Sequence, residues 1–213
     1  MAELALFDLD NTLLDRAGAF RRWTNDFVER NGYPDDAVAT IIELDEEGYK
    51  RRPQFFADLR AAFSLTPSVE ELQADYDERY PSFFRVEEST MESLRRLRSL
   101  GWKIGVVTNG APTQWNKLNA TKLTGEVDAV CISAELDIWK PNPGIFEEAA
   151  RRCGVALDGW MVGDSASADI VGGHNVGLRT IWMHRGQSWD EELPPPTATA
   201  ASIAEAVDHI LSF

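Results

Sequence analysis

The sequence predicts an α/β fold in which a doubly wound parallel sheet carries an inserted all-helical module. Three observations support this prediction. Five short apolar runs are nearly continuous rather than alternating, which is typical of strands buried on both faces of a parallel sheet. Helical patterns lie between the later runs, as expected for a strand–helix repeat. The long interval between the first and second runs contains no strand-like segment.

The expected strands are short and rich in Val, Ile and Trp, and they are Leu4–Leu9, Trp102–Thr108, Val127–Ser133, Trp160–Val162 and Leu178–Trp182. Ser89, with Glu92 three residues later, is the expected N-cap of a helix that stops at Gly101. A second helix presents Ile145 to Cys153 on one face and ends at Gly154. The proline-rich stretch 193–197 reads as an extended connector to a closing helix over 202–211.

Residues 17–85 are expected to form the inserted helical module. Aromatic residues recur there at helical spacing, as in Phe20, Trp23 and Phe27, and proline-containing breaks divide the segment into about four helices. Ser68 with Glu71 forms a capping-box signature for one of them. We therefore expect a core domain made of residues 1–16 and 86–213 and a helical domain made of residues 17–85.

Composition narrows the possible partners and the cellular location. The 213 residues include 21 Lys and Arg against 35 Asp and Glu, so the net charge of −14 argues against nucleic acid or an anionic membrane as a partner. The two cysteines are not part of a CxxC or Cys/His cluster, which argues against a disulfide framework or a zinc site. No apolar run approaches the roughly 18 residues of a membrane span, and the N-terminus lacks signal-peptide features. We expect a cytoplasmic protein.

Acidic residues follow the first expected strand. Asp8 and Asp10 lie two positions apart, so on an extended chain they point to the same side. Ligands of open parallel sheets bind outside the carboxyl ends of the strands. Two acids at such an edge need a compensating cation or proton, and Mg²⁺ suits oxygen ligands. Taken alone, the pair is also compatible with a helix cap or a turn.

Three later strand ends add further polar groups. The second strand ends in Thr108-Asn109-Gly110, whose hydroxyl and amide can donate to an anion. Lys140 precedes a proline-marked helix start, where the helix dipole favours an anion over a cation, so this lysine is placed to serve a bound anion. Asp164 follows the fourth strand, and Asp169 lies about one turn into the next helix. Each of these also has a plain structural reading as a turn, surface or capping residue.

The ordered set of motifs resembles the haloacid dehalogenase-like hydrolase superfamily. The matching segments are FDLDNTLLD at 7–15, TNG at 108–110, KPNPGIF at 140–146 and GDSASAD at 163–169. The resemblance covers essentially the whole chain and includes a helical cap inserted after the first motif, as in the C1-capped branch. One departure is Asn11, where many relatives have glycine.

The resemblance implies a role for each matching residue. Asp8 matches the nucleophile that forms an aspartyl-phosphate, and Asp10 matches the general acid/base. Thr108 and Lys140 match the phosphoryl-binding pair, with Asn109 beside them. Asp8, the Asp10 backbone carbonyl and Asp164 match the Mg²⁺ ligands.

The matching role of Asp169 leaves two possibilities, since it is either a further metal-shell acid or the partner of Lys140. The implied activity is Mg²⁺-dependent hydrolysis of a small phosphomonoester, which agrees with the dependence of phosphoryl transfer on charge stabilisation. The expected partner is a small phosphorylated metabolite, and the expected assembly is a monomer or a homodimer.

Several alternatives remain open at this stage. A 2-haloacid dehalogenase shares the fold and the nucleophile but needs no acid at the Asp10 position. A phosphonate hydrolase would need a cap lysine that forms a Schiff base, and Lys50 is the one lysine in residues 17–85. A sugar-phosphate mutase would need the cap to shield the intermediate from water. A phosphate-accepting receiver domain does not fit the order of the motifs or the large insertion, and a non-catalytic binding protein would be expected to lack one of the acids.

The helical module contains one notable basic run, Lys50-Arg51-Arg52, which precedes Pro53 at a break between two helices. We expect at least one of these residues to contact the leaving group of the substrate. The competing interpretation is a solvated cluster that pairs with Asp45, Glu46 and Glu47.

Overall fold

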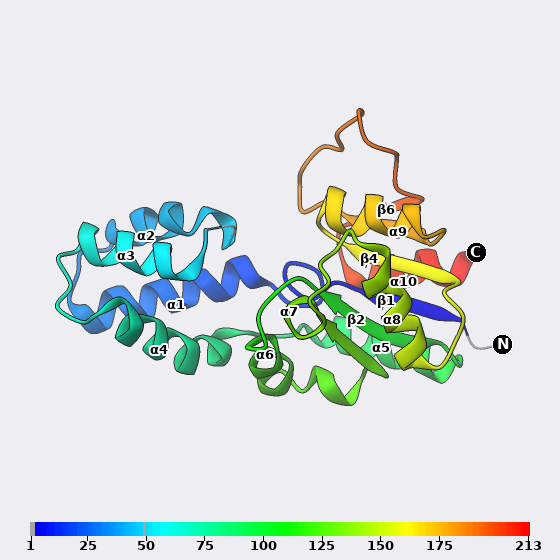
Figure 1. The fold of residues 1–213 in the computed structure, drawn as a ribbon, viewed down its shortest axis with the longest axis horizontal. Coiled ribbons are helices and arrows are strands. Elements are labelled where there is room, and N and C mark those ends of the chain that lie inside the picture. Colours follow the sequence, from blue (N-terminus) through cyan, green and yellow to red (C-terminus); the bar gives the residue numbers. More distant parts are fainter. Residues whose placement is uncertain (1–2, 49) are drawn as a thin grey trace. The chain divides into compact units, whose positions relative to one another are not determined.

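The protein is described by a computed structural model that covers residues 3–48 and 50–213. A six-stranded sheet, with all its neighbouring strands parallel, has the order β3-β2-β1-β4-β5-β6 (Figure 1). The strands are β1 (Leu4–Phe7), β2 (Lys103–Thr108), β3 (Ala129–Ile132), β4 (Gly159–Gly163), β5 (Arg179–Met183) and β6 (Ala198–Ala200). The parallel α/β sheet predicted from the apolar runs is confirmed. The edge strand β6 was not predicted, because its Ala-Thr-Ala sequence gives no apolar run.

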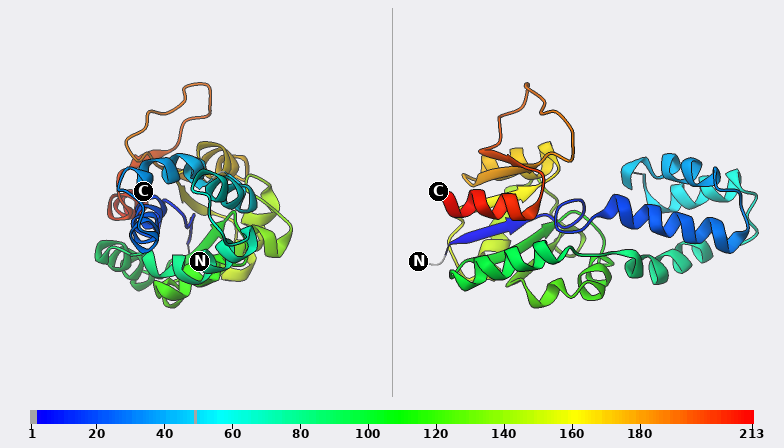
Figure 2. Two further views of the ribbon diagram at one scale, coloured as in Figure 1. Left: turned by 90° about the vertical axis from the view of Figure 1, so that its left-hand side faces the viewer. Right: turned by 180° about the vertical axis from the view of Figure 1, so that it is seen from behind.

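Helices cover both faces of the sheet. They are α5 (Glu88–Ser99), α6 (Gln114–Ala120), α7 (Ser133–Leu136), α8 (Pro143–Cys153), α9 (Gly172–Asn175) and α10 (Ile203–Ser212), with a 3₁₀ turn at Leu123–Gly125 and a π-helical segment at Ala166–Val171. Helices α5 and α10 pack side by side on one face, and α8 packs on β1, β2 and β3 (Figure 2). Under α8, side chains such as Leu6, Val107, Phe146 and Met161 form a fully buried apolar cluster. The continuous apolar runs are thereby explained, since β1 is buried at every position.

Helix ends follow the sequence signals in most places. Asn142 caps α8 by accepting a hydrogen bond from the Gly144 amide, and α8 ends at Gly154 in the left-handed conformation with φ 72°. Ser202 caps α10 as its position before the expected closing helix suggests. The expected N-cap at Ser89 is wrong. Helix α5 begins one residue earlier after the extended Glu87, and the Ser89 hydroxyl donates to the Glu87 carboxylate at 3.3 Å instead of capping the helix.

In the described part of the inserted segment, every regular element is a helix. These are α1 (Arg16–Asn31), α2 (Ala37–Asp45), α3 (Arg52–Ala62) and α4 (Val69–Arg79), with 3₁₀ segments at Glu46–Gly48 and Tyr80–Phe83. The expected capping box is present, because the Ser68 hydroxyl and the Glu71 carboxylate each accept from the other residue's amide. The aromatic residues pack on one another, as Trp23 meets Phe27 with ring centroids 5.4 Å apart and Tyr76 edge-on at 4.9 Å. This aromatic stripe is the core of the module.

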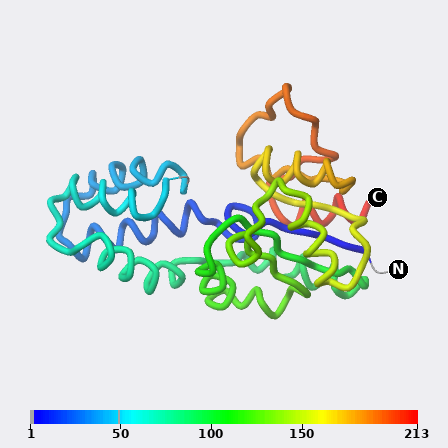
Figure 3. The backbone as a smooth tube through the Cα atoms, in the orientation of Figure 1, coloured from blue at the N-terminus to red at the C-terminus, as the bar shows by residue number. Residues whose placement is uncertain are grey.

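The chain divides into two compact units. One contains the residues up to Leu14 together with Val86–Phe213, and the other, the helical module, contains Asp15–Arg85. The backbone can be followed in Figure 3 from β1 into the module and back to α5. Both cysteines are free and buried, Cys131 in β3 and Cys153 at the end of α8. Within the described residues, no helix combines the length and apolar character needed to cross a membrane.

Candidate active site

The first and fourth strands bring two acidic segments to one edge of the sheet. β1 and β4 are parallel neighbours, with Phe7 opposite Val162, so Asp8 and Asp164 follow strands that end side by side. The Asp8 amide continues the ladder by donating to the Val162 carbonyl at 2.9 Å. In this strand order β1 and β4 flank the point at which the chain reverses direction across the sheet, which is where open α/β sheets bind ligands.

Lys140 joins the two acidic segments. Its Nζ atom lies 2.6 Å from Asp8 Oδ1 and 2.6 Å from Asp169 Oδ1. Only 2% of the lysine side chain is exposed, against 10% of Asp8 and 1% of Asp169. Asp169 also accepts from the Ser165 amide at 3.0 Å. A buried charge needs such partners, so the lysine and the two carboxylates are held as one unit.

The carboxyl groups at this edge hold their protons more tightly than usual. Burial is the main cause that raises the pKa of Asp8 to about 7, with Lys140 opposing the rise and Asp169 adding to it. Burial and the nearby Asp8 raise the pKa of Asp164 to about 6, and Arg185 opposes this shift. Burial alone would lower the pKa of Lys140, but Asp169 and Asp8 together raise it, so the lysine stays charged. The cluster is therefore short of positive charge.

The same acids can hold a metal ion. One oxygen from each of Asp8, Asp164 and Asp169 lies within 4.8 Å of the others. An all-oxygen set of this kind suits Mg²⁺, and a divalent cation would compensate the negative charge that burial and the neighbouring acids make costly here. Asp164 is the more open ligand, with 20% of its side chain exposed, whereas Asp169 is already engaged with Lys140. The residues present therefore fit a hard divalent cation.

Thr108 and Asn109 lie at the end of the neighbouring strand β2. Thr108 is 1% exposed. The Asn109 side chain binds the backbone of Lys140 twice, since its amide donates to the Lys140 carbonyl at 3.0 Å and its oxygen accepts from the Lys140 amide at 2.8 Å. Asn109, predicted to contact substrate, thus also fixes the segment that carries Lys140.

Three polar residues at this end of the sheet were not predicted from the sequence. Gln114 Nε2 donates to Thr108 Oγ1 and Asp10 Oδ2, and Lys117 Nζ donates to both Asp10 carboxylate oxygens. Arg185, after β5, lies 3.4 Å from the Asp164 carboxylate. A usable signal was present for the first two, because Gln114 and Lys117 are three residues apart on a helix directly after the TNG motif and therefore share one face.

The turn after β1 accounts for the departure at position 11. Asn11 has φ 61°, in the left-handed region that glycine adopts freely and that asparagine tolerates better than most residues. Its amide donates to the Leu14 carbonyl at 2.6 Å, which closes the turn that carries Asp10. Asparagine is therefore compatible with the backbone conformation of this turn.

The basic run of the helical module makes ion pairs within that module. Lys50 Nζ lies 3.0 Å from both Glu46 and Asp58, and Arg52 lies 2.7 Å from the buried Asp45. Arg51 is exposed at the start of α3. The pairs with Asp45 and Glu46 are two of those expected if the basic run is a cluster that pairs with neighbouring acids. Contact between the run and a substrate stays a prediction.

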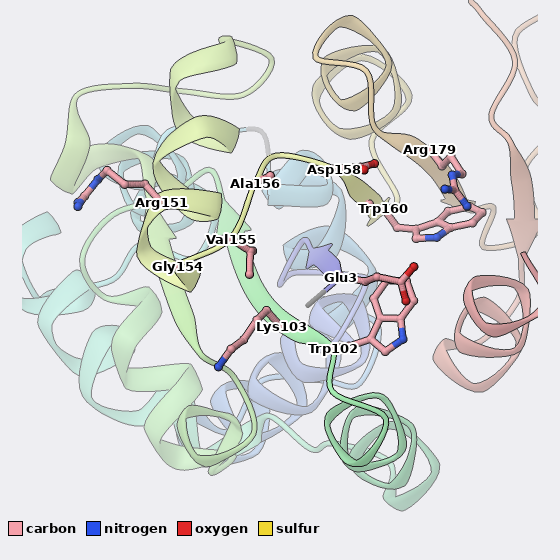
Figure 4. Close-up of a pocket in the computed structure, with 11 residues that line it drawn as sticks. Glu3, Trp102, Lys103, Arg151, Gly154, Val155, Ala156, Asp158, Trp160 and Arg179 are labelled. Carbon is pink, nitrogen blue, oxygen red and sulfur yellow. The ribbon is translucent and has the colours of Figure 1, made fainter. Parts of the chain in front are cut away.

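A separate pocket of about 820 Å³ lies at the opposite edge of the sheet, at the amino ends of the strands (Figure 4). Its lining includes Trp102, Trp160 and Arg179, whose guanidinium lies 5.2 Å from the Trp160 ring. The basic side chain of Lys103 is already paired with Asp128 at 2.7 Å. This pocket does not include the acid cluster.

Comparison with known proteins places the chain among similar sequences of one family. Residues 2–177 match the sequence profile of the haloacid dehalogenase-like hydrolases. The chain is 32% identical over 198 residues to a glyceraldehyde 3-phosphate phosphatase of Pyrococcus abyssi, a match that covers 88% of this chain and 83% of the relative.

Two solved structures illustrate the fold similarity. The HAD-hydrolase YfnB of Bacillus subtilis, solved with bound magnesium, has a TM-score of 0.81 at 23% identity, covering all of this chain and 99% of that one. A 2-haloacid dehalogenase of Pseudomonas syringae has a TM-score of 0.64 at 26% identity, with 100% and 99% coverage. The fold is thus common to proteins named for two different reactions.

The close approach of β4 to Asp169 yields a prediction about Gly163. A Cβ atom at this position would overlap the Asp169 carboxyl group, which cannot move freely because Lys140 and the Ser165 amide hold it. We expect Gly163→Ala to lower the free energy of unfolding by about 1–3 kcal/mol, as overpacking does. Thermal denaturation measures this loss. Gly125→Ala is the matched control, because its Cβ would meet open space. Equal melting temperatures for the two variants would contradict the prediction.

Proposed function

The chain belongs to the haloacid dehalogenase-like hydrolase family, and we propose that its acid cluster hydrolyses a small phosphomonoester. The family and the phosphatase relatives identify it as a hydrolase that acts as a phosphatase on small phosphorylated substrates. The main support for the roles of the individual residues is the contact of Lys140 with both Asp8 and Asp169. This contact lies within a cluster of three carboxylates that could hold a metal ion.

In the first proposed step, Asp8 is the nucleophile. A carboxylate repels a phosphate dianion, so the attack requires positive charge close to both groups, and Lys140 provides part of it. An Asp8 oxygen forms a bond to phosphorus while the ester P–O bond breaks, and Asp10 gives its proton to the leaving oxygen. Thr108 and Asn109, which lie at the adjacent strand end, would bind the phosphoryl oxygens.

In the second proposed step, the intermediate is hydrolysed. Asp10 accepts a proton from water, the water oxygen bonds to phosphorus, and the bond from phosphorus to Asp8 breaks. Inorganic phosphate is released and Asp8 is restored. Asp10 therefore acts first as an acid and then as a base, and the second proton transfer restores the proton that the first one used.

We further propose that the cluster binds Mg²⁺. Asp8, Asp164 and the Asp10 carbonyl would hold the ion, with Asp169 contributing directly or through water. When bound, Mg²⁺ supplies charge that neutralises the phosphoryl oxygens. The support for this assignment is the all-oxygen donor set and the raised carboxyl pKa values.

The alternatives within the family are weighed by particular residues. A haloacid dehalogenase has no use for an acid at the Asp10 position, and here that acid is held by Gln114 and Lys117. For a phosphonate hydrolase, Lys50 would have to be free to form a Schiff base, but it is paired with Glu46 and Asp58. A mutase remains an alternative of the same chemistry, distinguished by where the phosphoryl group finally goes.

A screen of phosphorylated metabolites with Mg²⁺ tests the proposed function. We expect the wild-type protein to release inorganic phosphate from at least one small phosphomonoester, with glyceraldehyde 3-phosphate as the first candidate because of the similar relatives. Asp8→Asn should abolish this turnover and keep the wild-type melting temperature within a few degrees, since asparagine keeps the side-chain volume and Lys140 retains Asp169 as a charged partner. Halide release from 2-haloacids without metal, or an active Asp8→Asn variant, would overturn the assignment.

Metal dependence provides a second test. EDTA should remove the phosphatase activity and added Mg²⁺ should restore it. Asp164→Asn should raise the Mg²⁺ concentration needed for half-maximal activity, because it removes one charged oxygen ligand. Isothermal titration calorimetry with Mg²⁺ measures the same loss without turnover. Full activity after exhaustive chelation would contradict the metal proposal.

The basic run of the helical module supplies a kinetic prediction. If the run contacts the leaving group, Arg51→Ala should raise KM for the best metabolite and leave p-nitrophenyl phosphate nearly unchanged. Arg51 is the residue to change first because it is exposed, whereas Lys50 and Arg52 support the module through ion pairs. Arg60→Ala, also at an exposed position of α3, is the control. Equal small effects on both esters would make the run structural.

A further inference from the structure

Two side chains of helix α6 connect Asp10 to the end of strand β2. Lys117 Nζ lies 2.8 Å from Asp10 Oδ1 and 2.6 Å from Asp10 Oδ2. Gln114 Nε2 lies 3.0 Å from Asp10 Oδ2 and 2.8 Å from Thr108 Oγ1. The Gln114 side-chain amide thus donates to two residues of the site, and Lys117 donates to both oxygens of the Asp10 carboxylate.

The local structure is built to aim these side chains. Gln114 and Lys117 are three residues apart, so they project from one face of α6, and Leu118, fully buried, anchors that helix to the core. Gly110 leaves the path of Gln114 open, because a Cβ at position 110 would lie only 2.9–3.1 Å from the Gln114 side chain. The glycine of the TNG motif therefore makes room for the glutamine.

Burial makes these contacts stronger than ordinary surface pairs. Gln114 is 3% exposed, and the side chains of Lys117 and Asp10 are 12% and 22% exposed. An ion pair at this depth is screened little by solvent, and two bonds to one carboxylate fix its plane as well as its position. The nearby Lys140 is committed to Asp8 and Asp169.

We propose that Gln114 and Lys117 are positioning residues that hold the Asp10 carboxyl group in line for both proton transfers. The proposal rests on the proposed function, in which Asp10 protonates the leaving oxygen and later takes a proton from water. Neither residue needs to touch the substrate. Proton transfer requires the donor within hydrogen-bond reach of the reacting oxygen, so a carboxyl group that swings out of line loses its catalytic contribution.

Leaving-group dependence separates this role from a merely structural one. Phenyl phosphate and p-nitrophenyl phosphate have nearly the same shape, but phenolate is much the more basic leaving group and needs the proton more. We expect Lys117→Met to lower kcat/KM for phenyl phosphate by about tenfold or more, and kcat/KM for p-nitrophenyl phosphate by less than about twofold. Gln114→Met, which keeps the length of the side chain, should show the same pattern with a smaller loss.

Three controls accompany this measurement. Lys117→Arg keeps the charge and the donors and should recover much of the loss with phenyl phosphate. Lys122→Met removes an exposed lysine just beyond α6 and should change neither ester. In an Asp10→Asn background, Lys117→Met should alter the residual kcat/KM for phenyl phosphate by less than about twofold, because the residue through which it acts is already disabled. Thermal denaturation confirms that each variant is folded.

The outcomes are distinguishable. Equal losses on both esters, or a full further loss in the Asp10→Asn background, would overturn the positioning role. If Lys117→Met does not fold, Gln114→Met carries the same comparison. If the wild type hydrolyses neither ester nor any phosphorylated metabolite, the proposed function fails and the positioning role fails with it. If Asp10→Asn shows a steep leaving-group dependence but Lys117→Met and Gln114→Met do not, the proposed function stands and the positioning role is rejected.

Discussion

The ion cluster in which Lys140 bridges Asp8 and Asp169 is the interaction on which the rest of the core depends. Parallel strands deliver acids to one edge, and burial makes each unpaired carboxylate costly. One lysine compensates two of them and keeps its charge because they surround it. Asn109 then has to fix the backbone that carries the lysine, as its two hydrogen bonds show. The remaining shortage of positive charge favours a cation at this edge, and the proposed Mg²⁺ would in turn attract a phosphoryl group.

Much of this arrangement could be predicted because strand ends are a strong constraint. Once β1, β2 and β4 are recognised as buried strands, the positions of Asp8, Thr108 and Asp164 at one edge follow from parallel topology. The spacing of Gln114 and Lys117 indicates that they share one helix face, but their contacts with Asp10 and Thr108 could not be deduced from it. They depend on the direction in which a short helix leaves a loop, and no periodicity in the sequence specifies that direction.

Other mismatches have similar local causes. Ser89 looks like a helix cap, but the extended residue before the helix is Glu87, and the Ser89 hydroxyl donates to the Glu87 carboxylate instead of accepting from a helix amide. In the helical module, charge pattern alone left the basic run with two interpretations. The structure shows that Asp45, 1% exposed, binds both Arg16 and Arg52, so part of the run has a role in holding the module together.

The central position of β1 has a consequence for how the protein is made. The strand that precedes Asp8 leaves the ribosome before its two neighbours in the sheet, because β2 follows the whole helical module and β4 follows about 50 residues after β2. Domains assemble as units during synthesis, and the module can complete its aromatic core while β1 still lacks both partners. A nascent or prematurely terminated chain that stops before β4 therefore lacks Asp164 and Asp169. On the proposed mechanism such incomplete products would not hydrolyse a phosphomonoester, because two of the proposed metal-binding acids are missing from them.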